Sequence, residues 1–167
     1  MNCKRILVPL DLRRSTTDPL RYLQQCAPES PFCATLLHVV ELNIAPHNSR
    51  LYEEMCAESR AALRELSRLF LGHEDAAEVR VRVGRADEQI LAEASSSRAE
   101  LIILSRGKPR HWCHFFHSRT VERVVQAAPC PALVLPVLWR MTEFQPADRA
   151  ELAAPVSVYA LRARRCA

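Results

Sequence analysis

RILVPL (residues 5–10) and ATLLHVV (residues 34–40) are short apolar runs with polar flanks, which is typical of strands buried on both faces of a parallel sheet. Between them, Asp18 and Pro19 predict the N-cap and first turn of a helix that ends before Pro31. A strand, a helix and a second strand in this order form a βαβ unit. The first 40 residues therefore predict an α/β fold with a parallel sheet.

The alternation of strands and helices continues to about residue 138. VRVRV (residues 79–83) alternates valine with arginine, as a strand at the edge of a sheet does. Five strands with crossover helices predict a doubly wound parallel sheet, which binds ligands beyond the carboxyl ends of its strands at the switch point. The further predicted elements are helices at 51–70 and 87–94, strands at 78–83 and 101–104, a helix capped by Ser118 and stopped by Pro129, and a strand at 132–137.

One domain accounts for most of the chain. A length of 167 residues with 49% hydrophobic residues suffices for one core and is short for two domains. We expect this domain to span residues 1–138. Residues 139–167 are then a C-terminal extension, which could be a tail, a short helix or an arm on a neighbouring subunit.

The apolar runs and the cysteines indicate a cytoplasmic protein. No apolar run approaches the roughly 20 residues that span a bilayer, and Asp11 directly after the first run argues against a signal peptide. Seven cysteines without a CxxC pair favour reduced thiols. We predict inert buried thiols at Cys3, Cys26, Cys33, Cys56 and Cys130, and exposed reactive thiols at Cys113 and Cys166.

The charges and the glycines exclude several classes of function. The net charge of +4 comes from basic residues interleaved with acids, so nucleic-acid binding is not expected. The three glycines, Gly72, Gly84 and Gly107, lie too far apart for a Walker A loop or a GxGxxG turn, both of which need clustered glycines around phosphate. Since GxSxG, HExxH and paired-cysteine zinc motifs are also absent, we predict a protein that is not an enzyme, which leaves slow ATP hydrolysis open.

Five segments, taken in order, resemble the universal stress protein family, and the resemblance covers nearly all of residues 3–138. It implies a doubly wound five-stranded parallel sheet of order 3-2-1-4-5, of the adenine nucleotide alpha hydrolase-like kind. It also implies a site between the first and fourth strands and a homodimer formed through the last strand. The five segments are ILVPLD (6–11), LLHVVE (36–41), VGRADEQIL (83–91), LIILSRG (101–107) and VERVVQAAPCPALVLP (121–136).

The adenine end of the family's nucleotide site has counterparts in this chain. In the ATP-binding branch, an aspartate that ends the first strand contacts the adenine or ribose, and a backbone position that ends the second strand contacts the adenine. The resemblance assigns these roles to Asp11, which Pro9 precedes by two residues, and to Val40.

The phosphate end departs from the family's pattern. The loop of the ATP-binding branch reads G-x2-G-x9-G-S/T, and counting back from APCP (residues 128–131) places it on four residues that include no glycine. Side chains would then occupy the space where the backbone approaches phosphate. The resemblance therefore implies the branch with a degenerate loop and weak or absent ATP binding. The four residues are Ser105, Lys108, Ser118 and Arg119.

Two hypotheses of function follow from this pattern. The first is a non-catalytic stress-response regulatory or interaction module that acts as a homodimer, with an unidentified protein partner and no cofactor. The second is a sensor of an adenine nucleotide such as ATP or AMP. It would keep Asp11 and Val40 and hold phosphate through the side chains of Arg106, Lys108 and Ser118.

A third class is a metal or redox module in HWCHFFH (residues 111–117). His111, Cys113, His114 and His117 are candidate ligands for zinc or copper, provided that the segment is helical. The aromatic residues between them favour a segment that simply packs on the domain. Elsewhere, we interpret His38 as a core histidine, and Asp11 equally as a ligand contact or as the cap of a turn.

Overall fold

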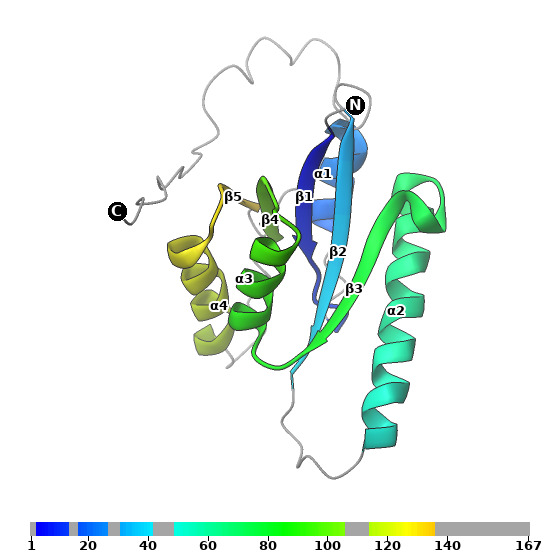
Figure 1. Ribbon diagram of the computed structural model, residues 1–167, viewed down its shortest axis with the longest axis vertical. Helices are drawn as coiled ribbons and strands as arrows, with labels where there is room; N and C mark the ends of the chain where they lie inside the picture. Colours follow the sequence, from blue (N-terminus) through cyan, green and yellow to red (C-terminus); the bar gives the residue numbers. More distant parts are fainter. Residues whose placement is uncertain (1–2, 14–16, 27–30, 42–48, 106–113, 136–167) are drawn as a thin grey trace.

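The computed structural model describes residues 3–13, 17–26, 31–41, 49–105 and 114–135. These residues form one α/β unit in which helices cover both faces of a central sheet (Figure 1). The elements are β1 (Lys4–Pro9), α1 (Asp18–Cys26), β2 (Phe32–Val40), α2 (Ser49–Leu71), a 3₁₀ turn (Glu74–Ala76), β3 (Ala77–Val83), α3 (Ala86–Ser96), β4 (Leu101–Ser105), α4 (His114–Ala127) and β5 (Ala132–Leu135).

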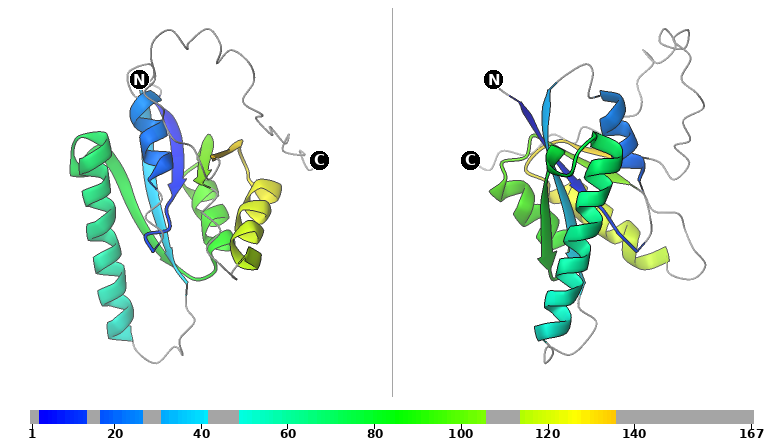
Figure 2. Two further views of the ribbon diagram at one scale, coloured as in Figure 1. Left: turned by 180° about the vertical axis from the view of Figure 1, so that it is seen from behind. Right: turned by 90° about the vertical axis from the view of Figure 1, so that its right-hand side faces the viewer.

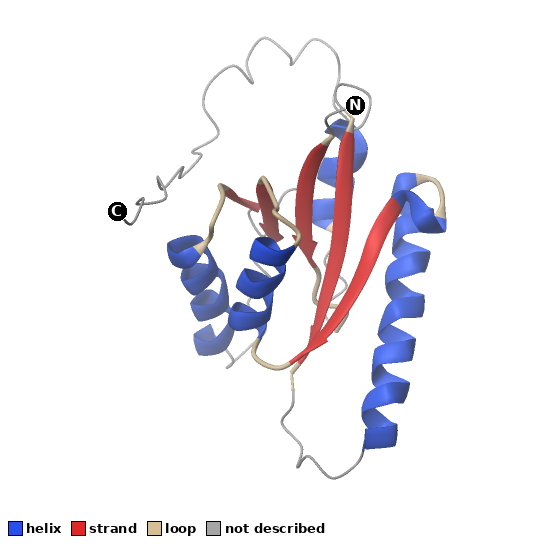
Figure 3. Cartoon of the chain, in the orientation of Figure 1, coloured by secondary structure: helices blue, strands red, loops and turns tan. Residues whose placement is uncertain are grey.

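The sheet has five parallel strands in the order β3-β2-β1-β4-β5 (Figure 3). This confirms the fold class and the strand order that the resemblance implies. It also confirms that the valine–arginine strand, β3, lies at an edge. The strand order changes direction between β1 and β4. The connections that leave the carboxyl ends of these two neighbouring strands therefore lead to different sides of the sheet.

Alternate residues of the central strands face two separate hydrophobic layers. Ile6 and Val8 of β1 pack with residues of α1 and α2, whereas Leu7 packs with residues of α3 and α4. The helices accordingly lie on opposite sides: α3 stands before the sheet in Figure 1, and α1 comes to the front in the reversed view of Figure 2. Burial of both strand faces explains why the sequence shows continuous apolar runs there.

The two predicted helix caps, Asp18 and Ser118, both lie inside helices. Asp18 is the first residue of α1 and not its cap, because the carbonyl of Thr17 accepts the amides of Leu20 and Arg21 at 3.0 Å each. The prediction that Ser118 begins the last helix was wrong, since α4 begins at His114. The segment between them contains neither proline nor glycine, so nothing in it interrupts a helix.

The prediction that the cysteines are reduced buried thiols was wrong for two of them. Cys3 and Cys33 form a disulfide with their Cα atoms 5.8 Å apart. The pairing of β1 with β2 places Arg5 opposite Cys33, which brings two cysteines separated by 30 residues together. Cys56 and Cys130 are free and half-buried. The side chain of Cys26 and all of Cys113 and Cys166 lie outside the described residues, as does the predicted extension at 139–167.

No helix in the described part of the chain is both long enough and apolar enough to cross a membrane.

Candidate functional site

A hollow of about 190 Å³ lies at the carboxyl ends of β1 and β2, where α2 passes beside them. Its wall combines apolar side chains with one basic and one acidic residue. The lining residues are Leu12, Arg13, His38, Val40, Met55, Glu58 and Ser59.

His38 supports this end of the sheet from within. Its side chain is buried, and its ring Nδ1 lies 2.9 Å from the carbonyl oxygen of Leu10. A carbonyl oxygen can only accept, so Nδ1 carries the proton and donates it. The amide of Leu10 in turn donates to the carbonyl of Leu37 at 2.8 Å. His38 is thus a satisfied core histidine, as predicted, and it fixes the chain at the point where Asp11 follows β1.

Asp11 caps a turn in this structure. Its Oδ1 accepts the backbone N–H of Arg13 at 3.1 Å, which is the hydrogen bond of an Asx turn. Of the two roles that the sequence left open for Asp11, the structure shows the cap.

Val40 lies at the same end of the sheet as Pro9 and Asp11. Its side chain is buried, and its carbonyl oxygen accepts the N–H of Gly84 at 3.1 Å. One lone pair of that carbonyl is therefore already used to join the end of β2 to the turn after β3. The structure brings all three predicted adenine-end residues to the end of the sheet where the strands have their carboxyl ends.

The predicted phosphate-end residues are only partly described. Ser105 ends β4 and is half-buried, and it comes level with Leu10 when the register Ile6↔Leu101 is continued. Arg119 is an exposed residue of α4. Arg106 and Lys108 lie outside the described residues, and the side chain of Ser118 is not described.

The predicted metal candidates are also only partly described. His114 and His117 lie in α4 three residues apart, so helical spacing places them on one face. Their side chains are not described, and His111 and Cys113 lie outside the described residues. Within the part of the chain that is described, no three His, Cys, Asp or Glu side chains are grouped as a metal site requires.

Two carboxylates beside the site, which the sequence did not point to, join the end of β2, α3 and α4. Oε1 of Glu41, just after β2, accepts the N–H of Ala86 at 3.2 Å and so caps α3. Asp87, in the first turn of α3, holds Arg85 at 3.0 Å and Arg123 of α4 at 2.9 Å. Only the spatial neighbourhood reveals this set, because Arg123 is 36 residues from Asp87.

Asp87 is mostly buried yet stays ionised. Burial alone would raise its pKa, but the hydrogen bond from Arg123 and the charges of Arg85 and Arg123 together lower the pKa of this carboxyl below its ordinary value. The network therefore holds α3 and α4 together beside the switch point through charge-assisted hydrogen bonds.

A model of the universal stress protein family matches residues 2–136. The chain belongs to this family. The match spans every strand of the sheet and ends one residue beyond β5. No curated protein matches the sequence.

Solved structures of other family members have the same fold. Universal stress protein UspA from Lactobacillus plantarum is 20% identical, with a TM-score of 0.60 over 81% of this chain and 99% of that one. A family member from Burkholderia pseudomallei is 22% identical, with a TM-score of 0.61 over 80% and 96%. A universal stress protein in complex with cAMP is 15% identical, with a TM-score of 0.56 over 82% and 99%. At these identities, the likeness establishes the architecture.

Proposed function

We propose that this universal stress protein is a non-catalytic regulatory or interaction module that binds ATP weakly or not at all. The observation that carries the proposal is the size of the hollow at the carboxyl ends of the strands. Its volume of about 190 Å³ among the described residues is below the roughly 300–1,000 Å³ of typical ligand pockets.

The charges in the lining of the hollow also offer no attraction for a polyanion. Arg13 and Glu58 are the charged residues of the lining, and they have opposite signs. A polyanion gains little from a wall in which a carboxylate offsets the guanidinium. The hollow itself therefore offers no concentrated positive charge.

Ser105 supports the proposal from the phosphate end. Of the described residues other than glycine, only Arg98 has a positive φ, so Ser105 has an ordinary strand-end backbone. The glycine-like conformation that brings backbone amides close to phosphate is thus not adopted at Ser105. This agrees with a loop of degenerate sequence at Ser105, Lys108, Ser118 and Arg119.

An adenine-nucleotide sensor is the second candidate function. It is favoured by two observations. Asp11 and Val40 lie together at the carboxyl ends of β1 and β2, and a relative was solved in complex with cAMP. In this alternative, AMP or ATP is bound at Asp11 and Val40, and side chains of Arg106, Lys108 and Ser118 hold its phosphate.

Titration calorimetry of the full chain with ATP, AMP and cAMP separates the two functions. We expect no binding with a dissociation constant below about 10 μM for any of the three nucleotides. A tighter constant that is lost in Asp11→Ala would overturn the first proposal in favour of the sensor.

Asp11→Asn is the matched control, because asparagine keeps an oxygen that can accept the Arg13 amide but removes the charge. If the wild type binds and both variants bind less well, the carboxylate contacts the nucleotide. If only Asp11→Ala loses binding, the nucleotide contacts the turn after β1, which the Asp11 side chain holds in shape, and not the carboxylate itself. Either pattern would support the sensor.

We further propose that the module is a homodimer that pairs through β5. In the described chain, β5 pairs with β4 alone, and the carbonyl of Pro131 accepts the N–H of Ile102 at 3.0 Å. The backbone carbonyl of Pro131 thus faces β4. Backbone groups of successive strand residues point to opposite sides, so those of Ala132 and Val134 point away from β4, to the outer edge. A free, apolar edge of this kind favours a second strand.

Proline at the outward-facing positions tests this dimer. Val134→Pro removes an N–H from the outer edge of β5 and should give a monomer by light scattering at concentrations where the wild type is a dimer. Val81→Pro is the control, because the bond from Gly84 to Val40 places the amide of Val81 on the outer edge of β3. We expect Val81→Pro to stay dimeric. A monomeric wild type, or a monomer from Val81→Pro alone, would refute pairing through β5.

A further inference from the structure

The Cys3–Cys33 bond lies at the amino ends of β1 and β2, the end of the sheet opposite the hollow. Neither sulfur takes part in the proposed nucleotide site. Cys33 is exposed and Cys3 is half-buried, so the bond is open to solvent. Exposed disulfides are the reactive ones, because an attacking thiolate can reach a sulfur.

Strand geometry places both cysteines on the same side of the sheet. Side chains alternate along a strand, so Cys33 shares the face of Leu37, and Cys3 shares the face of Leu7. Leu7 and Leu37 both pack in the layer formed with α3 and α4. The bond therefore lies on this face of the sheet.

A guanidinium group lies on the same face as the bond. Arg5 shares the face of Cys3 and lies opposite Cys33 in the strand register, whereas strand alternation turns the exposed Lys4 side chain to the other face. Arg5 donates from Nε to the carbonyl of Arg98 at 2.7 Å, and its charge is partly offset by Glu100 at 3.6 Å. Positive charge stabilises a departing thiolate and attracts an anionic thiol.

We propose that the Cys3–Cys33 pair is a site of reversible thiol–disulfide exchange with a small anionic thiol of the glutathione class, and that Cys33 is the residue that becomes thiolated. The thiolate attacks Sγ of Cys33, the bond to Sγ of Cys3 breaks, and Cys3 leaves as a thiolate that takes a proton from water. A second thiol then attacks the mixed disulfide and releases Cys33 as a thiol, together with the oxidised small molecule. The reverse sequence, driven by that oxidised molecule, rebuilds the bond.

The fold holds the two cysteines close to each other in both redox states. Six residue pairs join β1 to β2 from Lys4↔Phe32 to Pro9↔Leu37, and the N–H of Lys4 donates to the carbonyl of Pro31 at 3.5 Å. Reduction removes the covalent link but leaves this ladder in place. The thiols therefore stay near each other, and the bond can form again without refolding.

The proposal is tested on the full chain with reduced and oxidised glutathione. After incubation and acid quenching, peptide mass mapping reports the state of each cysteine. With millimolar reduced glutathione, we expect the bond to open through an adduct on Cys33, while circular dichroism stays native. In Cys3→Ser, oxidised glutathione should modify Cys33 about tenfold faster than Cys130 of the same chain, because burial and Glu100 raise the pKa of the Cys130 thiol.

Cys130→Ser and Cys56→Ser are matched controls that should leave the exchange at Cys3 and Cys33 unchanged. Three outcomes overturn the proposal. The first is that Cys3 and Cys33 remain free thiols after treatment with oxidised glutathione. The second is a bond that survives millimolar reduced glutathione in the native protein. The third is an adduct that forms on Cys130 as fast as on Cys33 in Cys3→Ser.

Discussion

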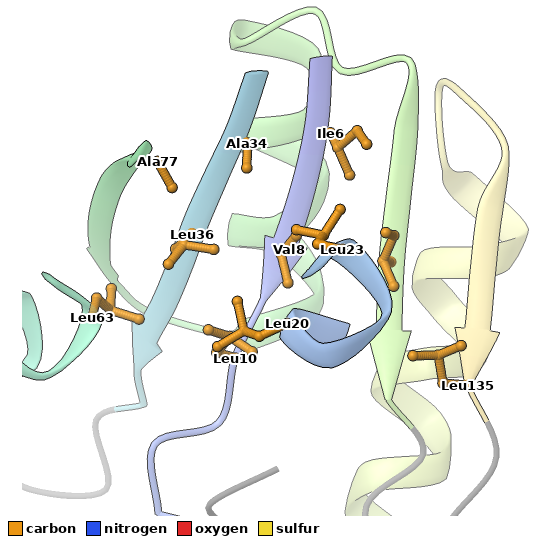
Figure 4. Packing of buried hydrophobic residues seen from close by; sticks show 11 residues of the cluster. Ile6, Val8, Leu10, Leu20, Leu23, Ala34, Leu36, Leu63, Ala77 and Leu135 are labelled. Carbon is orange, nitrogen blue, oxygen red and sulfur yellow. The ribbon is translucent and has the colours of Figure 1, made fainter. Parts of the chain in front are cut away.

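Replacing Leu36 by alanine is expected to lower the free energy of unfolding by about 2–5 kcal/mol. Leu36 is completely buried in β2, with Val8 of β1 opposite it on one side and Val79 of β3 on the other. Side chains of α1 and α2 close over it, among them Leu20 and Leu63 (Figure 4). Truncation removes buried methyl groups and leaves a cavity that paired strands cannot collapse to fill.

Urea denaturation followed by circular dichroism measures this loss, and Leu69→Ala is its matched control. Leu69 lies on α2 and is 56% exposed. The same chemical truncation there should change the free energy of unfolding by no more than about 0.5 kcal/mol. Equal losses in the two variants would contradict the assignment of Leu36 to the centre of the core.

In the ion pair Arg82–Glu93, replacing the arginine should lower the free energy of unfolding more than replacing the glutamate. The Glu93 side chain in α3 is 5% exposed, whereas the Arg82 side chain in β3 is 34% exposed. Arg82→Met keeps an apolar stem but leaves the carboxylate of Glu93 buried without its cation. We expect this variant to lose about 3 kcal/mol, because an uncompensated buried charge is costly.

Glu93→Gln should cost less, about 1 kcal/mol, since the guanidinium of Arg82 can turn to water and already lies 3.3 Å from Oγ of Ser96. The double variant Arg82→Met/Glu93→Gln leaves no unpaired charge, so it should be more stable than Arg82→Met alone. Denaturation of the four proteins forms a double-mutant cycle. If Glu93→Gln lost more free energy of unfolding than Arg82→Met, the burial of the Glu93 carboxylate would not be what determines the cost of breaking the pair.

The sequence predicted the strands better than it predicted the helix ends. Continuous apolar runs located β1, β2 and β4 to within about two residues, because burial on both faces leaves a clear local signal. Helix starts depend on backbone hydrogen bonds that several residue types can satisfy. For that reason, Asp18 was predicted as the N-cap although it is the first residue of α1. Ser118 was likewise taken for the start of α4, which begins at His114.

For the candidate site, the sequence indicated the strand-end residues but not their surroundings. The resemblance to the family assigned Pro9, Asp11 and Val40 to the adenine end, and for Asp11 the rule that ligands bind at the carboxyl ends of parallel strands points to the same place. Met55, Glu58 and Ser59 line the same hollow, yet in the sequence they are ordinary positions of a long amphipathic helix. Their spacing of three and four residues shows a shared helix face but not what that face meets.

The sequence by itself determined the α/β class, the five strands and the edge position of β3, because hydrophobic periodicity is a local property of the chain. Through the resemblance it also predicted that the family's glycine loop is replaced at Ser105, Lys108, Ser118 and Arg119, and this stays a prediction. Only the tertiary structure decided that Cys3 meets Cys33 and that Asp87 holds Arg123. Each of those contacts joins residues at least 30 positions apart, so it depends on strand register and helix packing, which local patterns do not encode.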